Sequence, residues 1–416
     1  MMLDPDSSEE SVAGKLFVPS LTLVNFSLFV VDIIAGVFLL GVTATFFGST
    51  EEVFVAITSQ LVTVASLVAA VFALLLGILS VKFNHKKLLV IGASCIPLGA
   101  LGCSLAPNFV FLQLFYSIEA IGTTVVMVMT MVLVGEMLAL KKRPKATGWI
   151  MTGPTFANMA GTLVISLFFV DLGSWRSYLL WFALPISLMA LAAAYFGVPS
   201  SVKTERETAE KNAYLSSFKQ VFLNRSATAC LIGNMFTAAS VIWIVYFVAF
   251  FMTKFGLSQA SGALVAFGMA PTGALGLIIG GYLVNKVGRK KLWLTTSTIS
   301  GVTLPLLAFV PELWIVLIIT YLREFIGAIG RPASLNLTLE QTPKSRGTML
   351  SINNFLNWVG ASIGGVVGGV ALAFFGYNGV IFAFASMLLI AAAIFFFFVK
   401  DPCITIQPES TKFKPS

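Results

Sequence analysis

The chain has 416 residues, of which 57% are hydrophobic and only 11% are charged. Soluble proteins carry about 25% charged residues, so this composition excludes a soluble enzyme, a disordered chain, a collagen and a coiled coil. It indicates a polytopic membrane protein. The net charge of +8 reflects membrane topology rather than nucleic-acid binding, as shown below. The four cysteines form no C-x-x-C pair, so we expect no metal site and no cofactor.

Twelve apolar stretches are long enough to cross a bilayer, which takes about 20 helical residues. In the first half they cover roughly Phe17–Leu40, Val53–Val81, Leu88–Ala106, Phe109–Leu138, Ala146–Val170 and Tyr178–Val198. In the second half they cover roughly Thr228–Met252, Ala260–Val284, Leu292–Val310, Leu313–Leu339, Met349–Phe375 and Val380–Val399. The residues before the first span are acidic and lack the basic start of a signal peptide, so we expect this span to be retained.

The basic residues are concentrated in every second loop. Of the 26 lysines and arginines, only Arg176 and Lys254 fall in loops predicted to face outward, and Arg323 and Arg331 fall within a span. The others lie in segments that face inward if the amino terminus is inside. The positive-inside rule therefore predicts a multi-pass protein of the cell membrane with both termini in the cytoplasm.

The two halves repeat each other. GILSVKFNHKKL at 77–88 aligns with GYLVNKVGRKKL at 281–292, an offset of 204 residues, and Glu119 and Glu324 lie 205 apart. Parallel duplication is typical of one class of secondary transporter. The predicted fold is an all-α membrane protein with twelve transmembrane helices in two pseudo-symmetric six-helix bundles. The predicted domains are a tail at 1–16, a bundle at 17–199, a cytoplasmic linker at 200–224, a bundle at 225–400 and a tail at 401–416. The linker could also form an amphipathic helix on the membrane surface.

These motifs carry a resemblance to the major facilitator superfamily over nearly the full chain, and most closely to its proton-coupled drug or sugar efflux members. The family's loop motif is nearly complete after span eight, with Asn285 at the acidic position, and degenerate after span two, where Val81 replaces the acid. Span ten carries the family's Arg-x-x-x-Gly pattern at Arg323–Gly327. The resemblance implies that spans one, four, seven and ten line a central cavity.

The same resemblance implies that the two loop motifs contribute to an inner gate. The motif residues are Gly77, Lys82, Lys86, Lys87, Gly281, Asn285, Lys286, Gly288, Arg289 and Lys290. Because valine cannot accept a hydrogen bond and asparagine can, we expect the second loop to contribute more. Gly281 is expected at a close helix crossing. The single histidine, His85, is expected to be a surface charge of the first loop.

Five charged residues lie at membrane depth, where an uncompensated charge is costly. They are Asp32, Glu119, Arg323, Glu324 and Arg331. Asp32, Glu119 and Glu324 are candidate proton carriers. For Glu119 the alternative is a carboxylate permanently paired with Arg323 or Arg331, and for Asp32 a solvated position at the mouth of the cavity.

Arg331 and Arg323 are candidates for substrate binding, because the planar guanidinium suits a carboxylate or phosphate. Glu324 and Arg331 are seven residues apart and therefore share a helix face, so an internal ion pair is the alternative. Further candidates for substrate contact are Asn25, Asn158, Asn357, Asn234, Trp243 and Tyr246. For the tryptophan, packing is the favoured interpretation, and for Asn158 and Asn357 hydrogen bonding between helices.

Small residues recur every four positions at Gly360, Gly364 and Gly368, and at Gly153, Ala157 and Gly161. Such stripes let helix backbones approach closely.

The sequence therefore predicts a secondary active transporter that moves a small organic solute by alternating access. Proton-coupled efflux of a neutral or cationic solute is favoured. The alternatives are a facilitative uniporter, an uptake symporter for an organic anion or sugar, and a transporter-like sensor. We expect a small-molecule substrate, protons and the lipid bilayer as partners, no nucleic acid, and a monomer. No nucleotide-binding loop or nucleophile–base arrangement supports an enzyme or an ATP-driven pump.

Overall fold

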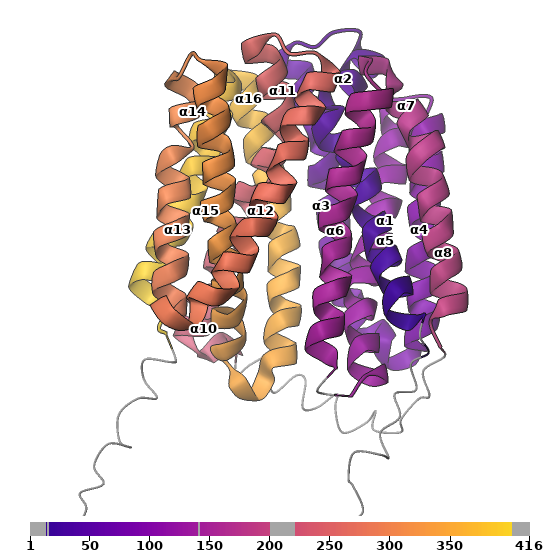
Figure 1. Cartoon of the computed structure of the whole chain (residues 1–416), viewed down its shortest axis with the longest axis vertical. Helices are drawn as coiled ribbons and strands as arrows, with labels where there is room; N and C mark the ends of the chain where they lie inside the picture. Colours follow the sequence, from indigo (N-terminus) through magenta and orange to yellow (C-terminus); the bar gives the residue numbers. More distant parts are fainter. Residues whose placement is uncertain (1–13, 15, 140–141, 200–220, 402–416) are drawn as a thin grey trace, which may run out of the picture. The chain divides into compact units, whose positions relative to one another are not determined.

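The computed structural model describes residue 14 and the ranges 16–139, 142–199 and 221–401 (Figure 1). Every regular element in these ranges is helical. The tail expected at 1–16 and most of the linker expected at 200–224 lie outside the described residues, as does the tail after Asp401. Among the described residues, eleven helices are long and apolar enough to cross a membrane. The predicted all-α membrane fold is confirmed.

Internal contacts divide the chain into two compact units, which are described separately. The first contains the described residues of Met1–Glu205 together with Phe247–Ala270, and the second those of Arg206–Tyr246 and Pro271–Ser416. The helices before Glu205 are α1 (Phe17–Val37), α2 (Leu39–Phe47), α3 (Glu52–Lys82), α4 (His85–Leu105), α5 (Phe109–Met137), α6 (Arg143–Phe168), α7 (Trp175–Tyr178) and α8 (Leu184–Gly197). A π-helical turn at Leu179–Ala183 connects the last two.

The remaining helices include two that cross from one unit to the other, α11 and α12. In chain order they are α10 (Arg225–Val241), α11 (Trp243–Phe255), α12 (Gln259–Val287), α13 (Arg289–Thr303), α14 (Leu306–Phe309), α15 (Leu313–Glu340) and α16 (Arg346–Phe398). The last of these covers both of the final predicted spans. It is interrupted at Gly376, whose φ of 64° is favourable only for glycine, so the chain reverses there without a separate loop.

Local side chains explain where several helices begin. Asn84, Asn108 and Asn224 precede α4, α5 and α10, and each side-chain oxygen accepts a hydrogen bond from a backbone N–H of the first turn. These bonds satisfy donors that have no partner inside the helix. Gly288 precedes α13 with a φ of 91°, a conformation that a residue with a side chain rarely adopts.

Glycines set the close helix pairs of the first unit. A Cβ at Gly153 of α6 would lie 2.7 Å from the carbonyl oxygen of Thr22 on α1, so the two backbones nearly touch. A Cβ at Gly122 of α5 would lie 2.6 Å from the carbonyl oxygen of Gly92 on α4. The stripe predicted through Gly153 and Gly161 is thus part of a real helix contact.

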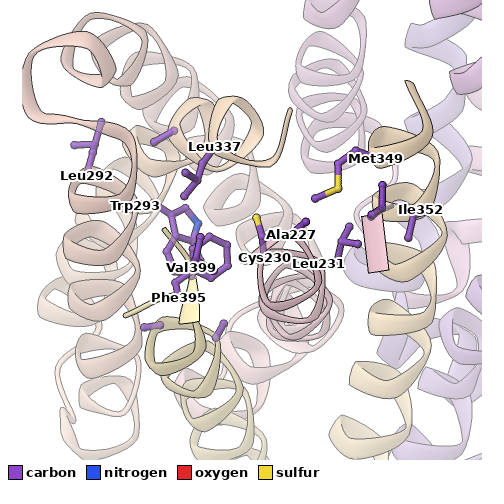
Figure 2. Packing of buried hydrophobic residues seen from close by; sticks show 14 of the residues in the cluster. Ala227, Cys230, Leu231, Leu292, Trp293, Leu337, Met349, Ile352, Phe395 and Val399 are labelled. Carbon is purple, nitrogen blue, oxygen red and sulfur yellow. The ribbon is translucent and has the colours of Figure 1, made fainter. Parts of the chain in front are cut away.

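The second unit has an apolar core built from the helix ends near residues 227, 292, 337, 352 and 395 (Figure 2). Trp293 of α13 stacks on Phe395 of α16 with ring centroids 3.8 Å apart. Stacked aromatic rings bury a large apolar area for little loss of side-chain entropy. This pair fastens the beginning of α13 to the end of α16.

The predicted stripe in α16 also forms a close contact. Cβ atoms at Gly360 and Gly364 would collide with the backbone carbonyls of Met235 and Ala239 on α10, and one at Gly368 would lie 2.6 Å from the Tyr246 ring. The expectation for Gly281 is different. A Cβ there would meet nothing within 4 Å, whereas one at Gly280 would meet the α15 backbone at Ile329. In the second unit the close crossing therefore lies one residue earlier than the sequence motif suggested.

We predict that Gly364→Leu lowers the melting temperature of the purified protein, because the α10 backbone leaves no room for the side chain. Overpacking of this kind costs about 1–3 kcal/mol or more. Gly281→Leu is the matched control in detergent-based thermal unfolding, since its new side chain enters open space. Equal destabilisation by both substitutions would contradict the assignment of the α10–α16 contact.

Candidate functional site

Two carboxyl groups, one buried and one half-buried, meet between α1 and α5 of the first unit. Glu119 is fully buried and accepts a hydrogen bond from Thr123 Oγ1 at 2.6 Å. Asp32 accepts one from Tyr116 Oη at 3.1 Å. The two carboxyl groups also face each other closely enough to hydrogen-bond. Since carboxylate oxygens only accept hydrogen bonds, this contact is favourable when one of the two groups holds a proton.

The packing around Glu119 holds it in place. A Cβ at Gly99 of α4 would lie 2.6 Å from Glu119 Cβ, so α4 presses directly on this side chain. No donor among the described residues reaches Glu119 Oε2. Neither Glu119 nor Asp32 pairs with a lysine or arginine among the described residues of the first unit. We call Asp32 and Glu119 the carboxyl pair.

Asn25 extends the same seam between α1 and α5. Its Nδ2 donates to Thr130 Oγ1 at 3.1 Å and to the Leu21 carbonyl at 2.8 Å. Its Oδ1 is buried and has no hydrogen-bond donor among the described residues. The seam is therefore rich in acceptors, which suits a proton or a cationic group better than an anion.

The ion pair considered for α15 is present in the second unit. Arg331 Nη2 lies 2.7 Å from Glu324 Oε1, as their shared helix face predicted. The Glu324 side chain is 17% exposed and that of Arg331 55% exposed. Arg323 projects elsewhere on the same helix, and its Nε is buried with no hydrogen-bond partner among the described residues.

Asn234 is the centre of a hydrogen-bonded cluster that joins three helices. Its Nδ2 donates to Thr338 Oγ1 of α15 at 2.8 Å and to Asn353 Oδ1 of α16 at 2.7 Å. Its Oδ1 accepts from Ser334 Oγ of α15 at 3.0 Å. The amide is fully engaged with its neighbours, so in this structure it connects α10 to α15 and α16.

Of the other residues expected to contact substrate, Asn158 lies in the first unit, and Asn357, Trp243 and Tyr246 lie in the second. Asn158 donates to the Pro154 carbonyl of its own helix at 3.3 Å, and Asn357 lies half-buried on α16. Trp243 is buried at the beginning of α11. Tyr246 is fully buried, packs against the Phe384 ring and donates to the Gly365 carbonyl at 3.4 Å. These contacts are those of packing residues.

The structure describes only some of the side chains of the two loop motifs. The side chains of Gly77, Lys82 and Asn285 lie outside the described residues, so the expected contribution of Asn285 to the gate stays a prediction. Lys87 and Lys286 are exposed, and Lys86 Nζ lies 5.7 Å from the centre of the Tyr195 ring. In the second motif Arg289 forms an ion pair with Glu340, and Lys290 Nζ donates to the Phe396 carbonyl at 2.9 Å.

Sequence reasoning missed two features at these helix ends. His85 was expected to be a surface charge, but its ring contacts Glu136 at the end of α5. Asp401 was assigned to the tail, but it is buried, and its Oδ2 accepts a hydrogen bond from the Lys290 backbone N–H at 3.1 Å. Asp401 thereby caps the positively polarised beginning of α13. The 204-residue offset between Glu136 and Glu340 was a signal that could have indicated the first contact.

Comparison with known proteins agrees with this architecture. The family model of the Major Facilitator Superfamily matches residues 20–275 and 235–415, and the chain belongs to this family of membrane transporters. It is 27% identical over 346 residues to YbcL of Bacillus subtilis strain 168, an uncharacterized MFS-type transporter, covering 80% of this chain and 86% of the relative.

Two further comparisons bear on fold and on activity. The chain is 29% identical over 184 residues to the multi-drug resistance efflux pump PmrA of Streptococcus pneumoniae, a match that covers 42% of this chain and 45% of the pump. The crystal structure of a D-xylose–proton symporter superposes with a TM-score of 0.80 at 15% identity, covering 93% of this chain and 98% of the symporter. At that identity the likeness concerns the fold alone.

We predict that Asn234→Ala lowers thermal stability, because it deletes three hydrogen bonds between helices. Such bonds contribute about 0.6 kcal/mol each on average in membrane proteins, so the expected loss is about 2 kcal/mol. Asn158→Ala is the control, since the side chain of Asn158 donates to the Pro154 carbonyl of its own helix and to no other helix among the described residues. Thermal unfolding of both variants in the same detergent measures the difference. If the two variants unfold alike, Asn234 does not connect these helices.

Proposed function

We propose that the chain exports a neutral or cationic organic solute from the cell in exchange for protons, by alternating access. The observation that carries this proposal is the carboxyl pair, in which the fully buried Glu119 and the half-buried Asp32 face each other at membrane depth without a basic partner among the described residues of the first unit. Two facing carboxyl groups cannot both ionise at low cost in such a place, so the pair favours holding one proton. We further propose that both termini are cytoplasmic and that the transporter acts as a monomer.

The pair supplies the coupling as follows. When the site is open to the outside, one carboxyl group takes a proton, and Tyr116 and Thr123 stabilise the remaining negative charge by donating hydrogen bonds. When the site is open to the cytoplasm, a cationic or neutral solute and the proton compete for the same acceptors, and the proton leaves. The proton gradient then drives the solute outward.

Charge elsewhere favours the same class of solute. Glu324 neutralises Arg331, so the arginine does not offer a free positive charge in this state. The unpaired acidic groups of the first unit would repel an anion. The similarity to the efflux pump PmrA, 29% identity over a stretch that covers 42% of this chain, supports an export function. The alternative is an organic anion as solute, which the 55% exposure of the Arg331 side chain would allow if the ion pair opened.

We predict that Glu119→Gln abolishes concentrative transport while leaving exchange measurable, because glutamine keeps the shape of the side chain but cannot carry a proton. Everted membrane vesicles with an acidic interior provide the measurement, with ethidium, a lipophilic cation, added outside and its accumulation inside followed over time. Tyr116→Phe is the matched control, since it removes one hydrogen bond to Asp32 and keeps both carboxyl groups. It should weaken accumulation without abolishing it. Unchanged accumulation in Glu119→Gln would remove Glu119 from the mechanism.

The charge of the solute can be tested separately. We predict that ethidium transport in vesicles is inhibited by lipophilic cations and not by small carboxylates or phosphate esters. Arg331→Gln should change this selectivity little, because Arg331 is paired with Glu324. Strong inhibition by carboxylates that disappears in Arg331→Gln would instead identify an organic anion as the solute.

A further inference from the structure

Two contacts between a basic side chain and a glutamate occupy equivalent places in the sequence repeat. His85 and Arg289 are 204 residues apart, and so are their partners Glu136 and Glu340. In the first unit His85 Nδ1 lies 2.5 Å from Glu136 Oε1, and in the second the Arg289 guanidinium pairs with Glu340. Each pair joins the first residue of one helix, α4 or α13, to the last turn of another, α5 or α15. The two units thus use the same contact with different chemistry.

The histidine ring is placed between two acceptors. Nε2 lies 3.0 Å from the Ser80 carbonyl oxygen at the end of α3, and Nδ1 lies against the Glu136 carboxyl group. A carbonyl oxygen carries no hydrogen, so Nε2 must donate. In a neutral ring Nδ1 then has only a lone pair, which would repel a carboxylate at this distance. The contact is attractive only with one additional proton, held between Nδ1 and Oε1.

None of the other described charged groups at this end takes the place of that proton beside Glu136. The groups described on the neighbouring elements are Lys86 and Lys87 on α4 itself, Tyr195 on α8 near Lys86, and three basic residues at the beginning of α6. Of these three, Lys142 and Lys145 are exposed, and Arg143 donates to the Leu138 carbonyl at 2.9 Å. The side chain of Lys82 on α3 lies outside the described residues. The side chains of His85 and Glu136 are 22% and 36% exposed, so water can deliver and remove the proton.

We propose that His85 and Glu136 form a regulatory proton-binding site, distinct from the carboxyl pair that we assign to coupling. Glu136 follows Glu119 by 17 residues on α5, which separates the two sites by about 25 Å along the helix axis at 1.5 Å per residue. A bound proton joins α3, α4 and α5 at this end, and its loss releases them. Arg289 keeps its charge at every physiological pH, so the matching contact of the second unit does not respond.

Histidine is the side chain that ordinarily changes charge between about pH 5 and pH 8, whereas arginine does not titrate in proteins. Transport therefore depends on the pH of the compartment that this end of the first unit faces, even without a pH gradient. The positive-inside topology places it in the cytoplasm. This inference requires only that the protein be a transporter, and it stands independently of the proton-export proposal.

The single histidine of the chain permits a direct test. Protein labelled with ¹⁵N-histidine and purified through a histidine-free tag gives one imidazole, observed as pH is raised in steps. We expect a doubly protonated ring at low pH that becomes the neutral Nε2–H form. In Glu136→Gln the Nδ1 resonance should shift while Nε2 changes little. A neutral ring protonated on Nδ1, or identical Nδ1 shifts in both proteins, would overturn the proposal.

A transport measurement tests the regulatory role. Ethidium exchange is measured in vesicles with equal pH on both sides, at about pH 6 and about pH 8, which bracket the titration of histidine. His85→Arg should hold the exchange rate at about pH 8 near the wild-type rate at about pH 6, because arginine keeps the contact closed. Arg289→His, the repeat-equivalent change, should add pH dependence. If the His85→Arg profile superimposes on that of the wild type, His85 does not regulate transport, whatever the outcome of the tests on Glu119.

Discussion

The structure depends on one constraint, the cost of leaving a polar group without a partner in hydrocarbon. Helices satisfy the backbone, so the constraint falls on the few polar side chains inside the spans. In the first unit it brings together Asp32, Tyr116, Glu119 and Thr123, and in the second it builds the cluster around Asn234. Each cluster connects different helices and so contributes both to stability and to the positions of the groups proposed for function.

The two units solve the same packing problem with opposite chemistry. The first holds its polar interior with carboxyl groups and closes one end with a histidine, whereas the second uses a glutamate–arginine pair in α15 and closes the equivalent end with an arginine. Among the described residues, the basic member of the contact at the beginning of α4 is therefore a histidine in the first unit, whereas both glutamate contacts of the second unit use an arginine.

Hydropathy and periodicity were sufficient to predict the helices and the contacts between residues of one helix. Glu324 and Arg331 share a face because seven residues are nearly two turns, and the glycine stripe of α16 indicated its close neighbour. Contacts between distant helices could not be read in this way. Asp32 and Glu119 are 87 residues apart, and nothing in either span specifies that they face each other. His85 was misread because its motif was considered alone, without Glu136 as the counterpart of Glu340. The break at Gly376 was indicated by the sequence, because the last two predicted spans end at Phe375 and begin again at Val380.

The cap that Asp401 places on α13 has a consequence for biogenesis. The Lys400 backbone bonds to Ser226 and Gln341, at the beginning of α10 and the end of α15, and Asp401 bonds to the beginning of α13. These residues are synthesised after every helix that they fasten. During membrane insertion these three helix ends therefore lack the hydrogen bonds of Lys400 and Asp401 until the ribosome has synthesised the residues that follow α16.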